Sequence, residues 1–431
     1  MKCRALFLGL ALLGGGQARA ADPAKIDWNK IPAVTVTLFY PGQSSYEWLV
    51  SDAHKGAVKE VRRGDACSFC HDEPDNEKDI GNNTVSGKRL EPNPPKGKNG
   101  HIDLKVQAAY DERNAYLRFQ WKTAGKPGID YPGYRFDGKG WKSWGGPQLN
   151  ADVRAGKLPA IQDDRLSLMI DDGKVPNFAK QGCWLTCHDG SSDMPKTATK
   201  DEVEANALLS ALKKTDVRKY LPASRNDPTD WKSGKSIEEI AKIKADGGFV
   251  DLIQWRAHRT NPVGGVDDGY VLAYRNFDAG KNHSDSNLDE KNQPRFMFDE
   301  AKRGAKAMTA DDLGKRENFL IKGVNAVPFD PNADWKEGDL LPQYVLSAAD
   351  AAGSAADNKG SGVWKDGMWT VVITRPLNLT NADDKTLKPG GVYNVGFAVH
   401  DDNIKTRGHH VGWVRSLGLG VKADIEAVKL P

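Results

Sequence analysis

The chain has 431 residues, of which 39% are hydrophobic and 28% are charged, a composition typical of globular domains and too polar for an integral membrane protein. Three of the 61 basic residues lie within the first twenty positions, so residues 21–431 carry equal numbers of acidic and basic side chains. This balance gives no support to binding of nucleic acid or of an anionic membrane, because both depend on clustered Lys and Arg.

Residues 1–20 have the pattern of a secretory signal peptide. Two basic residues open the segment, an apolar run follows, and Ala18-Arg19-Ala20 has the form of a cleavage site. The apolar run is shorter than the ~18 residues that a membrane span needs, and no later stretch reaches that length. We therefore expect a mature protein that begins near Ala21, lacks a membrane span and is exported to a bacterial periplasm.

Four cysteines remain once Cys3 leaves with this segment. The first two lie in Cys67-Ser68-Phe69-Cys70-His71, the C-x-x-C-H pattern of covalent haem attachment. Cys67 and Cys70 are spaced to attach to the two vinyl groups of one haem, and His71 is placed to bind its iron. A zinc site would need a second ligand pair, a redox dithiol would need a βαβ pattern, and a structural disulfide is the third alternative.

The segment before residue 101 offers a second axial ligand for this haem. His54 lies thirteen residues before Cys67, in a run over 53–62 that predicts a short helix. Such a helix can fold His54 back over the haem, whereas the alternative is a solvated surface histidine. His101, which opens the next predicted strand, is the main competing ligand.

The rest of the chain is predicted to be mainly β. Apolar residues alternate with polar ones over 102–110 and again over 117–121, which predicts a hairpin. Further short strands are predicted at 165–171, 250–258, 270–274, 369–375 and 392–400. Many short strands separated by Gly, Pro, Asn and Asp are typical of an antiparallel β-sandwich or barrel.

Domain boundaries follow from composition. The segment 92–100 is rich in Pro, Gly and Lys and predicts a linker, so we expect a small haem region over 21–100 and a β domain over 101–431. Helical periodicity over 201–220 and 236–245, and low-complexity sequence within 275–360, interrupt the strands. The expected insertions in the β domain therefore lie near 195–245 and 275–360.

The second cysteine pair lies in Cys183-Trp184-Leu185-Thr186-Cys187-His188, with three residues between the thiols. This C-x-x-x-C-H pattern is a less common form of haem attachment, and a small disulfide loop is the alternative. An aspartate follows the histidine in both motifs, and haem attachment accounts for Cys183 and Cys187 as it does for the first pair. We therefore interpret this motif as a second haem c site, with His188 as an iron ligand.

Histidines near the C-terminus are candidate ligands for the second iron. His400 ends a predicted strand, and His409 and His410 open the next extended run. Neighbouring residues of a strand point to opposite faces, so only one of His409 and His410 is expected to face a pocket. Met194, soon after the second motif, is a further candidate as a soft ligand.

Several motifs resemble the haem-binding subunit family of ethylbenzene dehydrogenase and related molybdenum enzymes. They are Val106-Gln-Ala-Ala-Tyr-Asp111 with Tyr116-Leu-Arg-Phe-Gln-Trp121, Asp164-Arg-Leu-Ser-Leu168, Trp255-Arg-Ala-His258 and Gly396-Phe-Ala-Val-His-Asp401. The resemblance covers roughly 100–425 apart from the insertions. It implies a β-sandwich that holds one haem between loops near the sheet edge.

The same resemblance implies a ligand set that this sequence changes. Members in molybdenum enzymes hold a non-covalent haem b through Met and Lys. In this chain Cys187-His188 occupies the segment of the Met, and His409 matches the position of the Lys. The resemblance thus implies His188 and His409 as the axial pair, with His410 pointing away. Because this haem is tethered and its ligands differ, assembly with a molybdenum subunit does not follow.

Together these patterns predict a periplasmic dihaem cytochrome c that relays electrons between redox partner proteins. Each of its two haem c groups is expected to be bound by two histidines. The sequence has no nucleophile–base array, zinc-protease motif or phosphate-binding loop, which favours electron transfer over catalysis. Two alternatives stay open: a haem subunit of a molybdenum-type dehydrogenase complex, and a haem redox enzyme with one open iron site.

Overall fold

The structure is a computed structural model that describes residues 21–41, 44–87, 94–123, 125–188, 198–315, 318–405 and 408–431. The expected signal peptide and Met194 lie outside the described residues. Within these ranges the chain is mainly antiparallel β-sheet with few helices. The predicted fold class is therefore confirmed.

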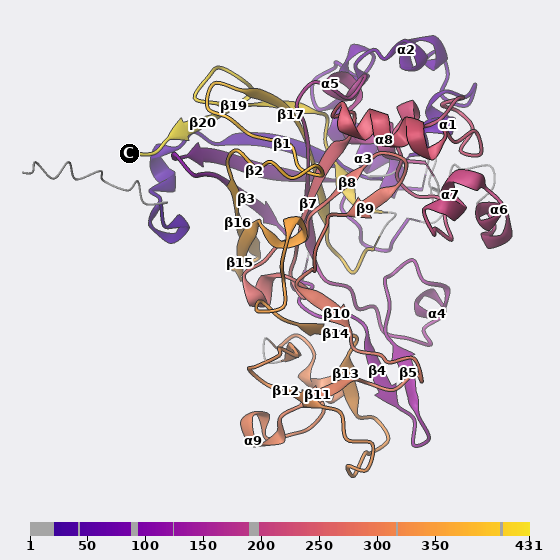
Figure 1. Ribbon diagram of the computed structural model, residues 1–431, viewed down its shortest axis with the longest axis vertical. Coiled ribbons are helices and arrows are strands. Elements are labelled where there is room, and N and C mark those ends of the chain that lie inside the picture. Colours follow the sequence, from indigo (N-terminus) through magenta and orange to yellow (C-terminus); the bar gives the residue numbers. More distant parts are fainter. Residues whose placement is uncertain are drawn as a thin grey trace, which may run out of the picture.

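Thirteen strands form two facing layers joined along one edge, and Figure 1 shows them in the upper half of the molecule. The first layer contains β15 (Lys359–Lys365), β16 (Met368–Pro376), β3 (Asn114–Lys122) and β2 (His101–Tyr110). The second contains β17 (Val392–His400), β6 (Arg165–Asp171), β7 (Val250–Arg256), β8 (Gly269–Val271) and β9 (Arg275–Phe277). The layers are connected through β1 (Val34–Phe39) with β18 (His410–Val411), and through β20 (Ile425–Lys429) with β19 (Arg415–Leu419).

The main hydrophobic core lies between the two layers. Phe119 of β3 and Phe397 of β17 meet edge to face with 5.7 Å between ring centroids. Trp255 of β7 lies 4.9 Å from Trp369 of β16 by the same measure. Because alternate residues of a strand point to opposite faces, the other residues of β17 face outward, where Ala398 packs in a second apolar cluster. The second layer is therefore buried on both faces.

Short helices gather beside the outer face of the second layer, at the upper right of Figure 1. They are α1 (Tyr46–Leu49), α2 (Val58–Arg63), α3 (Asn76–Val85), α5 (Phe178–Gln181), α6 (Lys200–Glu204), α7 (Ala207–Ala211) and α8 (Ile237–Ala245). Both cysteine motifs belong to this region, in the 3-10 turns Cys67–Phe69 and Gly182–Thr186. The helices thus cover the sheet and position the motifs at the same time.

Two predicted helical segments differ from the structure. The helix expected over 201–220 is instead α6 and α7, because the side chain of Asn206 accepts a hydrogen bond from the Leu209 amide and begins a new helix there. The helix expected over 53–62 begins only at Val58, so His54 lies in a preceding turn. The prediction over 236–245 is confirmed by α8, which begins after a capping box at Ser236.

The segments around 133–160 and 284–346 form a smaller lobe at the bottom of Figure 1. Its elements are β4 (Gly133–Phe136), β5 (Trp141–Trp144), β10 (Ser284–Ser286), β11 (Phe296–Phe298), β12 (Ala326–Pro328), β13 (Leu340–Pro342), β14 (Tyr344–Leu346), α4 (Ala151–Arg154) and α9 (Glu300–Arg303). Phe298, Leu340 and Leu341 belong to a separate apolar cluster in this lobe. The stretch predicted as loops therefore contains short strands with a core of their own.

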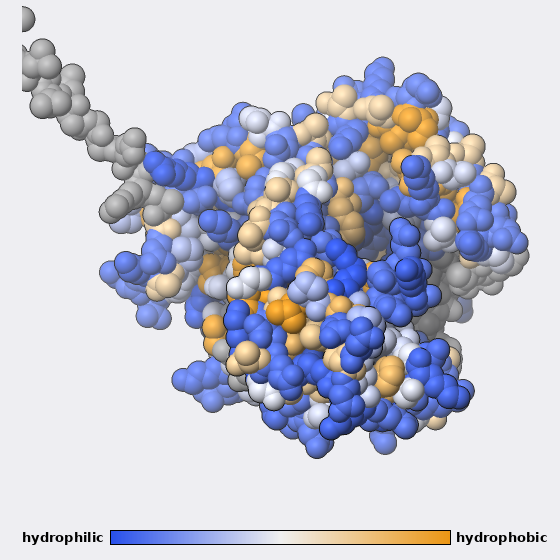
Figure 2. All heavy atoms as spheres, turned by 60° about the horizontal axis from the view of Figure 1, so that its bottom comes forward, coloured by the Kyte–Doolittle hydropathy of each residue, from blue (hydrophilic) through white to orange (hydrophobic). Residues whose placement is uncertain are grey.

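The surface in Figure 2 is mostly hydrophilic, and hydrophobic residues gather chiefly at its upper right, on the side where Figure 1 places the helices. A search of the described residues finds no helix whose length and apolar character would suit a bilayer span. The N-terminal segment is tied to the sandwich, because β1 pairs with both β2 and β18. Residues 21–100 therefore supply a strand of the sheet as well as the first cysteine motif.

Candidate haem sites

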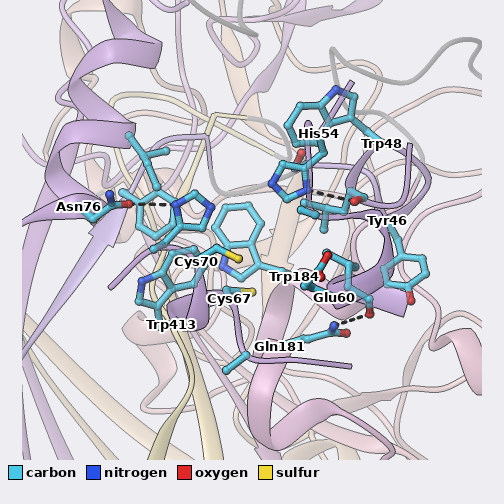
Figure 3. Close-up of a pocket in the computed structure, with 18 of the residues that line it drawn as sticks. Tyr46, Trp48, His54, Glu60, Cys67, Cys70, Asn76, Gln181, Trp184 and Trp413 are labelled. Atoms are coloured by element: carbon cyan, nitrogen blue, oxygen red, sulfur yellow. Dashed lines mark hydrogen bonds between the residues drawn. The ribbon is translucent and has the colours of Figure 1, made fainter. Parts of the chain in front are cut away.

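The first cysteine motif lines a cavity of about 690 Å³, a volume within the range of small-molecule and cofactor pockets. Figure 3 shows the sulfur atoms of Cys67 and Cys70 near the centre of this cavity, with Trp184 and Trp413 beside them and His54 across from them. Apolar and aromatic side chains make up most of the wall. The cavity thus combines two thiols with the apolar walls that a flat aromatic cofactor needs.

Two histidines face each other within this cavity. The ring centroids of His54 and His71 lie 6.4 Å apart, and their planes differ by 8°. When one metal ion binds two imidazoles, the distance between the ring centroids is the sum of two metal–nitrogen bonds of about 2 Å each and two nitrogen-to-centroid distances of roughly 1 Å each. This sum is nearly the separation observed. The pair is therefore spaced to hold one metal ion between the two rings.

Hydrogen bonds fix the orientation of both imidazoles. Nδ1 of His71 donates to Oδ1 of Asn76 at 3.1 Å, and Nδ1 of His54 donates to the carbonyl oxygen of Leu49 at 3.0 Å. Because both acceptors lack a proton to give, each Nδ1 carries the hydrogen and each Nε2 keeps a lone pair for a metal. Burial lowers the pKa of His71, with partial compensation by Asn76, so the ring is held in the neutral form that binds metals.

The structure places His54 and His101, the two predicted candidates for a second iron ligand, in different surroundings. The described residues that line the cavity include His54 and His71 but not His101. His101 instead opens β2, where its Nδ1 lies 3.4 Å from Oδ1 of Asn82 on α3. Of the two, only His54 is brought to the cavity.

The second cysteine motif is buried against the outer face of β17. Both Cys183 and Cys187 are buried. The sulfur of Cys183 packs onto Gly396, where an added Cβ would lie only 2.5 Å from that sulfur. Burial raises the pKa of the Cys183 thiol to about 12. The close approach therefore requires glycine at 396, which explains an outward-facing glycine in the middle of a buried strand.

His188 occupies a buried polar site with one unsatisfied nitrogen. Its Nδ1 donates to Oε1 of Glu47 at 2.8 Å, and the same oxygen accepts the Tyr220 hydroxyl at 2.7 Å. The Tyr220 ring stacks on the imidazole with 3.3 Å between centroids. Nε2 of His188 is buried and has no hydrogen-bond partner. In metal-binding histidines, a carboxylate bonded to one ring nitrogen typically orients the ring, and the other nitrogen binds the metal.

His409 directly precedes β18 and His410 is its first residue, and the two side chains contact different partners. His409 stacks on His400, with 4.3 Å between centroids and planes within 3° of parallel. His410 instead donates from Nε2 to the carbonyl oxygen of Asn99 at 2.8 Å. His409 and His400 therefore form one buried pair, and His410 belongs to a separate contact.

Lys219 connects this histidine pair with the second cysteine motif. Its Nζ lies 3.4 Å from Sγ of Cys187. Burial is the main cause that lowers the pKa of both His188 and His400, and the positive charge of Lys219 lowers it further. The ammonium group therefore contacts the second cysteine motif and acts electrostatically on His188 and His400.

Several residues of these sites carry no motif in the sequence. Glu47, Asn76, Tyr220 and Trp413 each contact a motif residue, yet none has a characteristic spacing from it. The alternation of apolar residues over Val34–Phe39 was a usable signal for β1, which brings Phe39 into the cavity wall. For the other four residues no local signal exists.

The fold and the motifs define a β-sandwich protein with two Cys–His segments on the outer face of one sheet. The sequence model described as ethylbenzene dehydrogenase matches residues 25–412. This chain belongs to the ethylbenzene dehydrogenase family. The match begins well before residue 100, so the family region also includes the first cysteine motif.

Two relatives carry the name cytochrome c. The chain is 28% identical over 414 residues to "Cytochrome c-552" of Stutzerimonas stutzeri, which covers 96% of this chain and 93% of that protein. It is 27% identical over 227 residues to "Cytochrome c-551" of Rhodocyclus tenuis, which covers 52% of this chain and 73% of that protein. The first similarity therefore extends over nearly the full length of both proteins.

Proposed function

We propose that this protein is a dihaem cytochrome c that transfers electrons between redox partner proteins of the periplasm. The observation that carries the proposal is the His54–His71 pair, which faces across a cavity that also holds Cys67 and Cys70. The names of the two relatives support the assignment of haem c. A haem c bound in such a site supplies reversible one-electron transfer.

At the first site, each residue has a defined part. Cys67 and Cys70 provide the thioether sulfurs, and His71 and His54 provide the iron ligands. Asn76 orients His71 through Nδ1. Two histidine ligands leave no open position on the iron, which favours an electron carrier over an enzyme that binds small molecules.

At the second site, Cys183 and Cys187 provide the sulfurs and His188 binds the iron through its unpartnered Nε2. His409, which stacks on His400, would supply the second iron ligand. The two sites adjoin, because Trp184 of the second motif also lines the first cavity.

One edge of the first site is exposed at the surface. Phe69 lies between the two cysteines of the motif and is 66% exposed, and Cys70 is exposed as well. An exposed aromatic side chain beside a haem edge offers a small apolar contact for transient docking. We propose this edge as the place where electrons enter or leave.

Spectroscopy of the purified native protein tests the proposal against both alternatives. We expect low-spin signals from two haems and no binding of CO or cyanide. A high-spin haem that binds CO would favour a redox enzyme with an open iron site. Co-elution with a molybdenum-containing subunit in size-exclusion chromatography would instead favour a dehydrogenase complex.

The substitution His54→Ala is expected to convert the first haem from low spin to high spin, because it removes one of two axial ligands. Electron paramagnetic resonance should show the change in one of the two haems. The matched variant His101→Ala should keep both low-spin signals. A normal spectrum for His54→Ala with a changed one for His101→Ala would transfer the ligand role to His101.

The substitution Glu47→Gln is expected to raise the reduction potential of the second haem by roughly 60 mV, which is a tenfold change for a one-electron couple. The carboxylate of Glu47 lies on His188, and its negative charge favours the oxidised iron. A spectroelectrochemical titration measures both potentials. Glu112→Gln, at an exposed position, is the control. If both reduction potentials are unchanged in Glu47→Gln, the charge of Glu47 has no effect on the second haem.

A further inference from the structure

A cluster of buried carboxylates lies between the two layers of the sandwich. Asp251 of β7 points inward and pairs with Arg375 of β16 at 2.5 Å. Asp268, which precedes β8, and Asp384, which precedes β17, pair with the same guanidinium at 3.6 and 3.3 Å. One carboxylate oxygen from each of the three aspartates lies within 4.8 Å of the others. Both layers of the sandwich therefore contribute to the cluster.

The charges in this cluster do not cancel. One guanidinium faces three carboxylates, and Asp278 adds a fourth nearby, since its backbone N–H donates to the carbonyl oxygen of Asp268 at 3.3 Å. The nearby ammonium of Lys385 is turned away, because it bonds Asp172 at 2.6 Å and the carbonyl oxygen of Gly247. Uncompensated buried charge is costly, so a further cation would relieve it.

Buried oxygen atoms around the cluster lack hydrogen-bond partners. Both carboxylate oxygens of Asp278, Oδ1 of Asp251 and the amide oxygen of Asn358 have none. Asp278 is 6% exposed and Asn358 is 0% exposed. Asn358 donates from Nδ2 to Asp268, and this contact places its amide group against the cluster. Because buried polar atoms are normally satisfied, these oxygens are spare ligands.

We propose that this cluster binds one Ca²⁺ ion through Asp251, Asp268 and Asp384. Asp278 and Asn358 supply further oxygen ligands. Calcium accepts six to eight oxygen ligands at about 2.3–2.6 Å in flexible geometry. Magnesium is disfavoured, because it keeps several waters and is seldom held by an all-protein set of oxygens.

The ion has a structural role at this position. The segments that carry its ligands are β7, the approaches to β8, β15 and β17, and the residue after β9. Arg375 already joins β16 to the same group. The ion therefore cross-links both layers of the sandwich and fixes the start of β17, the strand on which the second cysteine motif packs.

Metal analysis of the full-length, haem-loaded protein, purified without chelator, tests this inference. We expect inductively coupled plasma mass spectrometry to find one calcium ion per chain. Treatment with EGTA should lower the unfolding temperature by several degrees, and CaCl₂ but not MgCl₂ should restore it. A protein without calcium whose unfolding temperature is the same in EGTA and CaCl₂ would overturn the proposal. Equal recovery with MgCl₂ would overturn the choice of calcium.

A variant locates the ion. Asp278→Asn should weaken Ca²⁺ binding at least tenfold in a calorimetric titration with CaCl₂ after EGTA treatment. Asp311→Asn, the same substitution at an exposed position, should bind as the unchanged protein does. Wild-type affinity in Asp278→Asn would overturn the assigned site. If Asp278→Asn does not fold, the metal content and the EGTA response of the unchanged protein decide the question.

Discussion

Replacing both Cys183 and Cys187 by serine is expected to leave a protein with one covalently attached haem instead of two. A serine hydroxyl forms no thioether with a haem vinyl group, so the second haem loses its covalent attachment. The matched variant with serine at Cys67 and Cys70 should also keep one haem. Intact-mass spectrometry under denaturing conditions counts the attached haems directly, and replacement of all four cysteines should reduce the number to zero.

One result would contradict this prediction at once. If the unchanged protein carries a single haem mass and Cys183 is joined to Cys187 by a disulfide, the second motif is a structural loop. Cys183 lies in the turn Gly182–Thr186 and Cys187 follows it directly. Peptide mapping without reducing agent distinguishes a disulfide between them from thioether bonds. The first site and its His54–His71 pair would be unaffected by that outcome.

The substitution Phe397→Ala is expected to lower the free energy of unfolding by about 3–5 kcal/mol, the usual cost of removing a large aromatic side chain from a core. Phe397 is 2% exposed and packs edge to face on Phe119 of the opposite layer. Denaturation by guanidinium chloride measures the loss. Phe277→Ala, at a position that is 47% exposed, should change the same quantity by no more than about 0.5 kcal/mol.

Equal losses for the two variants would mean that the interior of the sandwich does not supply the stability that its burial indicates. The comparison is informative because β17 carries Phe397 on its inner face and Gly396 on its outer face. A loss confined to Phe397→Ala, with both haems still attached, would show that the inner face contributes stability independently of the haem sites.

The strands of the sandwich were predictable where burial shaped their sequence. The segments 165–171 and 392–400 coincide with β6 and β17, because both faces of these strands are covered and their residues are mostly apolar. The strands of the smaller lobe are three or four residues long, too short to show alternation. The prediction of one helix over 201–220 was wrong because the side chain of Asn206 caps a new helix, although the apolar residues on both sides follow a helical spacing.

Only those residues of the candidate sites that lie within the cysteine motifs could be predicted from their spacing in the sequence. The motifs predicted haem attachment at the four cysteines together with His71 and His188, since attachment requires fixed distances along the chain. Spacing left both His54 and His101 as candidates, and only the fold shows that His54 lines the cavity and His101 does not. Glu47 is separated from His188 by 141 residues and from Tyr220 by 173. Contacts at such separations arise from the fold and leave no pattern in a single sequence.

The burial of the second thiol pair has a consequence for biogenesis. An enzyme that joins haem to protein needs access to both sulfurs, and in the folded chain Cys183 and Cys187 lie beneath other segments. On the proposed function, that attachment precedes the closing of this region, so the nascent chain folds around a prosthetic group already in place. A chain that folds before attachment would keep both thiols buried, and haem added afterwards would not reach them.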